Sequence, residues 1–197
     1  MALVQRAVLW LMIASGFVVS IEPAPYEVLF VLTLVVFFAG GMRVSIVFAP
    51  LIAFLSLYNI GGFLSLMPII KDSTAWMFVI VSVYMAVTAI FFAMAVLRDP
   101  MRILAVMRNA WVFAALIASI NGMIGYFNVF GLGEAWAPIS RAQGMFKDPN
   151  VLSTFLVMPF IFLVQDIVVL RCRWTLLKIP VLVVIAAGLF LAFSRGA

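Results

Sequence analysis

The sequence contains no histidine, and it has a single cysteine, Cys172. Without an imidazole, these residues offer no histidine base, no histidine-ligated metal and no Ser-His pair. A single cysteine also excludes an internal disulfide and a thiolate cluster. Any acid–base chemistry carried by this chain must therefore use carboxylates, and we expect neither a metal nor a cofactor.

Charge is also scarce. Only 10% of the 197 residues are charged and 68% are hydrophobic, with a mean hydropathy of +1.31. A soluble domain of this size could not cover its surface with so few polar groups, so the composition indicates a polytopic membrane protein whose first partner is the lipid bilayer. The net charge of +5 does not indicate nucleic acid binding, because the cations lie at the ends of apolar runs and not among aromatics on one polar face.

Seven apolar runs are long enough to be read as membrane helices, since a helix needs about 20 residues to cross the bilayer. They cover residues 3–21, 28–42, 44–66, 74–97, 103–130 (or 111–130), 151–170 and 180–197. The first run also fits a secretory signal peptide, but Pro25 is poorly placed for cleavage after Ala24 and another run follows at once, which favours a retained helix. We expect an all-α bundle of about seven transmembrane helices, forming a single domain over residues 1–197.

Proline and asparagine positions suggest further detail within these runs. Pro50 and Pro159 fall inside the third and sixth runs, where a proline kinks a membrane helix, whereas Pro180 would open the seventh. Asn121 and Asn128 are seven residues apart in the fifth run, so they would share one helix face and form interhelical hydrogen bonds.

The distribution of cations predicts the orientation of the chain. With the amino terminus in the cytoplasm, eight of the twelve cations fall in cytoplasmic segments and four on the opposite side. That opposite side also receives five of the seven acids, so the positive-inside rule is satisfied. The polar interval from Arg141 to Asn150, the longest in the chain, is then extracytoplasmic, and Arg195 emerges on the same side.

The interval from Arg141 to Asn150 has the features of an anion site. Asp148 is a natural N-cap and Pro149 suits the first helical position. The positive end of the following helix would then face the outer membrane surface beside Arg141 and Lys147, where a phosphate could bind. An ordinary capped loop with snorkelling cations explains the same residues equally well.

Two further groups of residues carry charge near helix ends. Arg195 ends the last apolar run within the triplet Ser194-Arg195-Gly196. Asp166 lies near the end of the sixth run, and an acid within a membrane span is a functional candidate. Because a basic cluster follows it at once, we expect Asp166 to pair with that cluster, which consists of Arg171, Arg173 and Lys178.

An Arg-x-x-Gly-x-Phe-x-Asp-Pro-Asn stretch entering one helix, followed about 45 residues later by Ser-Arg-Gly at the end of the next, resembles the O-antigen ligase and O-antigen polymerase family. The resemblance covers about residues 135–197 by motif and the earlier helices by hydropathy alone. The matching residues are Arg141, Gly144, Phe146, Asp148, Pro149, Asn150, Ser194, Arg195 and Gly196.

The resemblance implies a multi-pass enzyme of the bacterial inner membrane that takes a glycan from an undecaprenyl-diphosphate carrier on the periplasmic side. Ligases of the family pass the glycan to lipid A–core, and polymerases pass it to another repeat unit. External arginines would bind the carrier diphosphate, which assigns that role to Arg141 and Arg195, with Lys147 as a weaker ligand and no catalytic residue identified.

Family members also have a large periplasmic loop beyond the Ser-Arg-Gly motif, with a functional histidine in the ligases. This chain has neither, so we expect it to match the amino-terminal portion of a longer membrane glycosyltransferase. The alternative hypothesis is a transporter or a flippase for lipid-linked oligosaccharides, suggested by the kinked helices and intramembrane asparagines.

Overall fold

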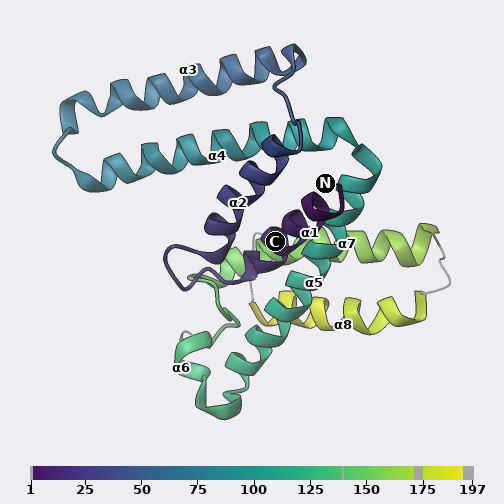
Figure 1. The fold of residues 1–197 in the computed structure, drawn as a ribbon. Helices are drawn as coiled ribbons and strands as arrows, with labels where there is room; N and C mark the ends of the chain where they lie inside the picture. The colour runs from purple at the N-terminus through teal and green to yellow at the C-terminus, as the bar shows by residue number, and fades with distance from the viewer. Residues whose placement is uncertain (1, 139, 171–174, 193–197) are drawn as a thin grey trace. The chain divides into compact units, whose positions relative to one another are not determined.

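The computed structural model describes residues 2–138, 140–170 and 175–192. Within these ranges it contains eight α-helices and no β-strand, which confirms the all-α prediction (Figure 1). The chain divides into two compact units. The first comprises Met1–Val36 and Ala105–Ala197, and the second comprises Phe37–Leu104.

The apolar helices match the predicted runs in number and order. Four helical segments of the described chain are long and apolar enough to cross a membrane: Ile46–Ser65, Ser73–Arg98, Pro100–Tyr126 and Pro149–Val169. Three shorter apolar helices occupy the remaining predicted runs: Leu3–Phe17, Pro25–Ala39 and Leu176–Ala192. The protein is therefore a membrane protein with several transmembrane helices.

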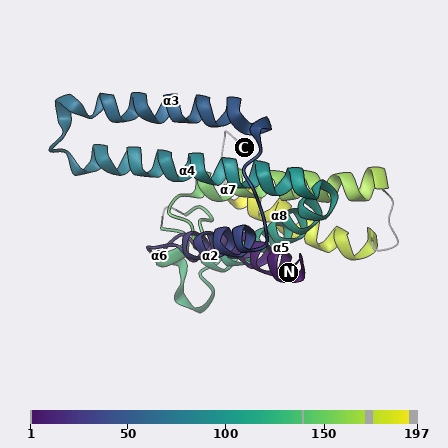
Figure 2. The ribbon, with the colours of Figure 1, turned by 45° about the horizontal axis from the view of Figure 1, so that its top comes forward.

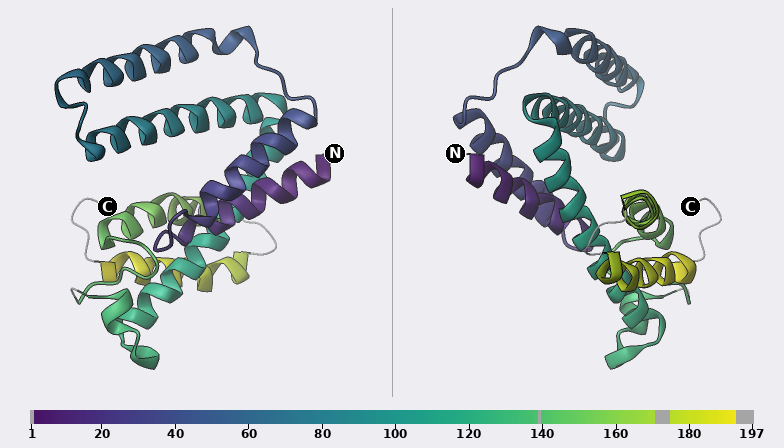
Figure 3. Two further views of the ribbon diagram at one scale, coloured as in Figure 1. Left: turned by 60° about the vertical axis from the view of Figure 1, so that its left-hand side comes forward. Right: turned by 90° about the vertical axis from the view of Figure 1, so that its right-hand side faces the viewer.

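The first unit contains the polar interval and the helices around it. Its helices are α1 (Ala2–Ala14), most of α2 (Pro25–Ala39), most of α5 (Pro100–Tyr126), α6 (Gly133–Trp136), α7 (Pro149–Gln165) and α8 (Thr175–Ala192). α7 and α8 run antiparallel and side by side, as Figures 1 and 3 show. After Gln165 the α7 helix continues as a π-helical turn from Asp166 to Leu170.

The core of the first unit lies where α5, α7 and α8 meet the polar interval. Its buried members are all apolar, and many are alanines that let backbones approach closely. They are Ala115, Ala118, Ala142, Phe146, Leu152, Leu156, Leu163, Ile185 and Ala192. Because Ala142 and Phe146 belong to the polar interval, part of that interval is inside the core.

The second unit is an antiparallel hairpin of α3 (Ala49–Ser65) and α4 (Ser73–Arg98), preceded by a short 3-10 helix from Ile46 to Phe48 (Figures 1 and 2). The Asp72 side chain caps α4 by accepting a hydrogen bond from the Thr74 amide at 2.8 Å. The Trp76 indole donates to the Ile70 carbonyl at 2.8 Å, which fixes the turn between the helices.

Two of the proline predictions are wrong and one is confirmed. Pro50 lies in the first turn of α3, so it begins that helix and does not kink its interior. Pro180 lies inside α8, which already begins at Thr175. Pro159 lies inside α7, as predicted.

The prediction that Asn121 and Asn128 share one helix face is also wrong. α5 ends at Tyr126, and Asn128 adopts a left-handed conformation with φ of 50°. Its side-chain oxygen accepts a hydrogen bond from the Gly133 amide at 2.8 Å. Asn128 therefore stabilises the turn after α5, a local role that asparagine's tolerance of positive φ allows.

Candidate functional site

The polar interval is a packed loop that leads from α6 into α7 and also contacts α8. The Ala142 amide donates to the Leu191 carbonyl at 3.0 Å, so the loop is bonded to the last turn of α8. On the α7 side, the ring of Phe146 is buried and lies 5.2 Å from the ring of Phe155. These contacts hold the backbone of the loop in place next to its charged residues.

Gly144 allows the loop to approach α5. Its φ is +61°, a conformation that residues with a Cβ rarely adopt, and a Cβ there would lie 3.2 Å from the Gly122 amide nitrogen. The amides of Gln143 and Gly144 both donate to the Trp136 carbonyl, at 3.0 and 2.9 Å. The contribution of Gly144 is therefore the backbone shape of a tight turn and not a side chain.

Arg141 links the end of α8 to the start of α7. Its Nε donates to the Ala192 carbonyl at 2.7 Å, and an Nη donates to the Asn150 side-chain oxygen at 2.9 Å. A guanidinium carries five N–H donors, so several donors of Arg141 have no partner among the described residues. Both acceptors are neutral, and the positive charge of Arg141 is therefore not compensated by them.

The start of α7 has the predicted cap. Asp148 adopts an extended conformation, its side chain accepts a hydrogen bond from the Asn150 amide at 2.6 Å, and Pro149 occupies the first turn. The amide of Asn150 is thus already used by the carboxylate. An anion at this helix end would meet Arg141 and the side chain of Asn150 more readily than free backbone amides.

Lys147 points to a different partner. Its ammonium forms an ion pair with Glu22, in the turn between α1 and α2. Both side chains are well exposed, at 55% for Lys147 and 75% for Glu22. The hydrogen bond from Lys147, and secondarily its charge, lower the pKa of the Glu22 carboxyl below the usual 4.5.

The structure therefore brings together only part of the predicted site. Arg141, Gly144, Asp148, Pro149 and Asn150 form one continuous arrangement at the start of α7. Lys147 lies in the same loop but is neutralised by Glu22. The remaining predicted residues, Ser194, Arg195 and Gly196, lie outside the described residues.

Three participants were missed from the sequence. The Ala192 carbonyl and Gly122 show no local pattern that links them to Arg141 or Gly144, because both contacts join distant parts of the chain. Glu22 did carry a signal, since the charge distribution places it on the same side of the membrane as Lys147. An acid and a base in different loops of one face are candidates for pairing.

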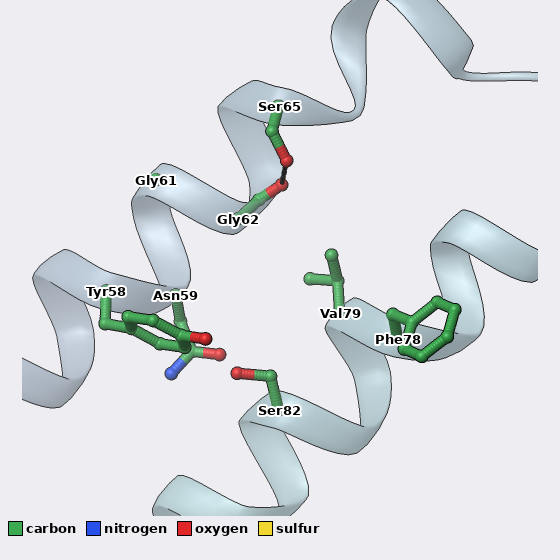
Figure 4. A pocket seen from close by; sticks show the side chains of 8 residues that line it. All are labelled: Tyr58, Asn59, Gly61, Gly62, Ser65, Phe78, Val79 and Ser82. Atoms are coloured by element: carbon green, nitrogen blue, oxygen red, sulfur yellow. Dashed lines mark hydrogen bonds between the residues drawn. The ribbon is translucent and has the colours of Figure 1, made fainter.

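A hollow lies in the second unit, between α3 and α4. Its volume is about 470 Å³, and Tyr58, Asn59, Ser65 and Ser82 contribute polar groups to its wall (Figure 4). The Asn59 amide nitrogen donates to the Leu55 carbonyl at 2.8 Å. The cavity wall contains no charged residue, so it does not suit a diphosphate.

Within the described ranges, no three His, Cys, Asp or Glu residues come together as a metal site. The expectation of a metal-free protein stays a prediction. Comparison of the chain with protein-family models, with curated proteins and with solved structures finds no match.

Proposed function

We propose that this protein is a membrane-embedded glycosyltransferase of the O-antigen ligase and polymerase type. The polar interval from Arg141 to Asn150, which we call the Arg141 loop, would hold the diphosphate of an undecaprenyl-diphosphate-linked glycan at the outer face of the bacterial inner membrane. The observation that carries the proposal is the placement of Arg141, which is held by two neutral acceptors and keeps both its charge and unused donors.

The chemistry follows from what a diphosphate leaving group requires. An acceptor hydroxyl would form a bond to the anomeric carbon of the glycan while the bond from that carbon to the diphosphate oxygen breaks. Negative charge grows on the departing diphosphate, and a fixed guanidinium stabilises that charge through paired hydrogen bonds. The proton of the acceptor hydroxyl would pass to a general base, and because the sequence has no histidine that base would be a carboxylate or a group from outside this chain.

The orientation belongs to the same proposal. The amino terminus would be cytoplasmic and the Arg141 loop periplasmic, as the positive-inside rule requires. The acceptor would be lipid A–core for a ligase or another repeat unit for a polymerase.

Binding of undecaprenyl diphosphate to the purified protein, measured by native mass spectrometry, tests the proposal. Arg141→Ala should weaken binding about tenfold or more, since hydrogen bonds to charged groups contribute about 1.5–3 kcal/mol. Lys71→Ala is the matched control, because Lys71 is an exposed cation predicted on the same side but outside the loop. Equal binding by wild type and Arg141→Ala would refute the site.

One of the observations behind the transporter hypothesis is not confirmed by the structure. The hypothesis rested on kinks in two helices, and Pro50 begins α3 without kinking it. Pro159 does lie inside α7, as that hypothesis required. The glycosyltransferase proposal is therefore the one that the described geometry supports better.

A further inference from the structure

A second cluster of charge lies in the first unit, where α5, α7 and α8 come together far from the Arg141 loop. Its centre is Asp166, which is only 6% exposed. One carboxylate oxygen accepts a hydrogen bond from Arg108, and the other accepts one from Lys178 at 2.5 Å. We call Arg108, Asp166 and Lys178 the Asp166 triad.

The sequence predicted an acid paired with the basic residues that follow it, and Lys178 confirms that in part. Arg171 and Arg173 lie outside the described residues. Arg108 was not foreseen, because it comes from α5 and is 58 residues away in the sequence. Its guanidinium also donates to the Phe162 carbonyl at 2.9 Å and lies 5.6 Å from the centre of the Phe162 ring.

The triad has an excess of positive charge and of donors. Two cations face one carboxylate, which leaves a net charge of one. Both Asp166 oxygens are used, whereas Nε and Nη1 of Arg108 and two hydrogens of the Lys178 ammonium have no partner among the described residues. The side chains of Arg108 and Lys178 are still 27% and 29% exposed. A ligand that completes this cluster must be anionic and must supply several acceptors without donors, which describes a phosphate.

The depth of the triad identifies the membrane surface that it faces. Asp166 is 17 residues beyond Pro149 along the α7 helix, a rise of about 25 Å. The hydrocarbon core is about 30 Å thick. The triad therefore lies near the interface opposite the Arg141 loop, where the charge distribution predicts the cytoplasmic side. Phosphates of anionic lipid headgroups lie at that depth.

We propose that the Asp166 triad binds the phosphate of an anionic phospholipid headgroup at the cytoplasmic interface. In this site Asp166 positions the two cations, and Arg108 and Lys178 contact the phosphate. The proposal is independent of the glycosyltransferase assignment, because it uses none of the residues of the Arg141 loop.

The test compares lipid retention by the full chain in native mass spectrometry. Wild type should retain phosphatidylglycerol in preference to phosphatidylcholine. Lys178→Gln should lower that preference about fivefold, the effect of one basic residue at an anionic surface, while leaving Arg108 and Asp166 as a neutral pair. Lys178→Arg should keep the preference for phosphatidylglycerol. The melting temperature of each variant in phosphatidylcholine nanodiscs shows whether that variant folds.

Arg102→Gln is the matched control, since Arg102 is a cation predicted on the same side, with a side chain that is 69% exposed and pairs with Asp99. It should leave the lipid preference unchanged. No preference in wild type, or an equal loss in Lys178→Gln and Arg102→Gln, would overturn the site. The last comparison uses the melting temperature of wild type in phosphatidylcholine nanodiscs, measured with added inorganic phosphate or with added phosphatidylglycerol. An equal rise in the two cases would overturn the assignment to a lipid.

Discussion

At the scale of single residues, the two partly buried arginines Arg141 and Arg108 differ in whether an acid is among their partners. Arg141 donates to a backbone carbonyl and to an amide oxygen. Arg108 donates to the carboxylate of Asp166 as well as to a carbonyl. A ligand at Arg141 therefore meets an uncompensated positive charge. At the Asp166 triad, Asp166 neutralises one cation, so the net positive charge that attracts a ligand depends on the presence of Lys178.

The Glu22–Lys147 pair gives a pH-dependent contact between two loops. Because pairing lowers the pKa of Glu22, its contribution to stability is present above the ordinary pKa and is lost as the pH falls through the lowered value. We expect the melting temperature of wild type to exceed that of Glu22→Gln slightly at pH 7. The difference should begin to shrink below pH 4.5 and disappear once the pH is below the lowered pKa of Glu22. Both side chains are exposed, so the effect will be small.

The control for this experiment is Glu22→Gln in a protein that lacks the Lys147 ammonium. In a Lys147→Met background, Glu22→Gln should change the melting temperature equally at pH 7 and in acid. A pH-dependent difference that survives in that background would show that Glu22 acts through another group.

At the scale of elements, the loop from Arg141 to Asn150 depends on its approach to α5 through Gly144. Gly144→Ala should destabilise the protein by about 1–3 kcal/mol, the usual cost of a strained backbone residue, since its φ is +61° and the added Cβ would press on Gly122. A lower melting temperature in detergent measures this. Binding of undecaprenyl diphosphate should fall with it, because the same loop holds Arg141.

Gly131 offers a matched comparison for Gly144. Its φ is +74°, and a Cβ there would meet nothing within 4 Å. Gly131→Ala should therefore show the cost of the backbone conformation alone, and the extra loss in Gly144→Ala measures the close approach to α5. Equal losses would mean that packing against α5 contributes nothing.

Features of an element that depend on neighbouring residues were predictable, and features that depend on distant ones were not. The Asp148 cap and Pro149 at the start of α7 follow from three consecutive residues, and the structure has both. The partners of Arg141 are Asn150 and the Ala192 carbonyl. Only Asn150 is near enough in the sequence for its position to have suggested the contact.

Prolines and asparagines in apolar runs were misread for a related reason. A proline is compatible with the first turn of a helix and also with its interior in a membrane, so Pro50 and Pro180 could not be assigned without knowing where each helix begins. The role of Asn128 likewise depends on a helix boundary, because α5 ends at Tyr126 and leaves Asn128 in the turn that follows. Hydropathy locates a span but not its ends to within a turn.

At the scale of the whole molecule, the distribution of charge between the two membrane faces makes a prediction about orientation. In a Cys172→Ser background, Lys71→Cys should react with a membrane-impermeant maleimide added to spheroplasts. Arg102→Cys should react only after the membrane is permeabilised, because it is predicted to be cytoplasmic. Lys71 and Arg102 are both exposed, so each introduced thiol is accessible. Labelling of Arg102→Cys in intact spheroplasts would reverse the topology and move the Arg141 loop to the cytoplasm.

The Asp166 triad also has a consequence for how the chain is made. Arg108 precedes Asp166 by 58 residues, and Lys178 follows it by 12. At translation rates of about 5–20 residues per second, Arg108 is already available when Asp166 leaves the ribosome. Lys178 follows within about one or two seconds at those rates. The order of synthesis thus makes Arg108 available to pair with Asp166 while α7 enters the bilayer, and Lys178 can then join α8 to α5 and α7.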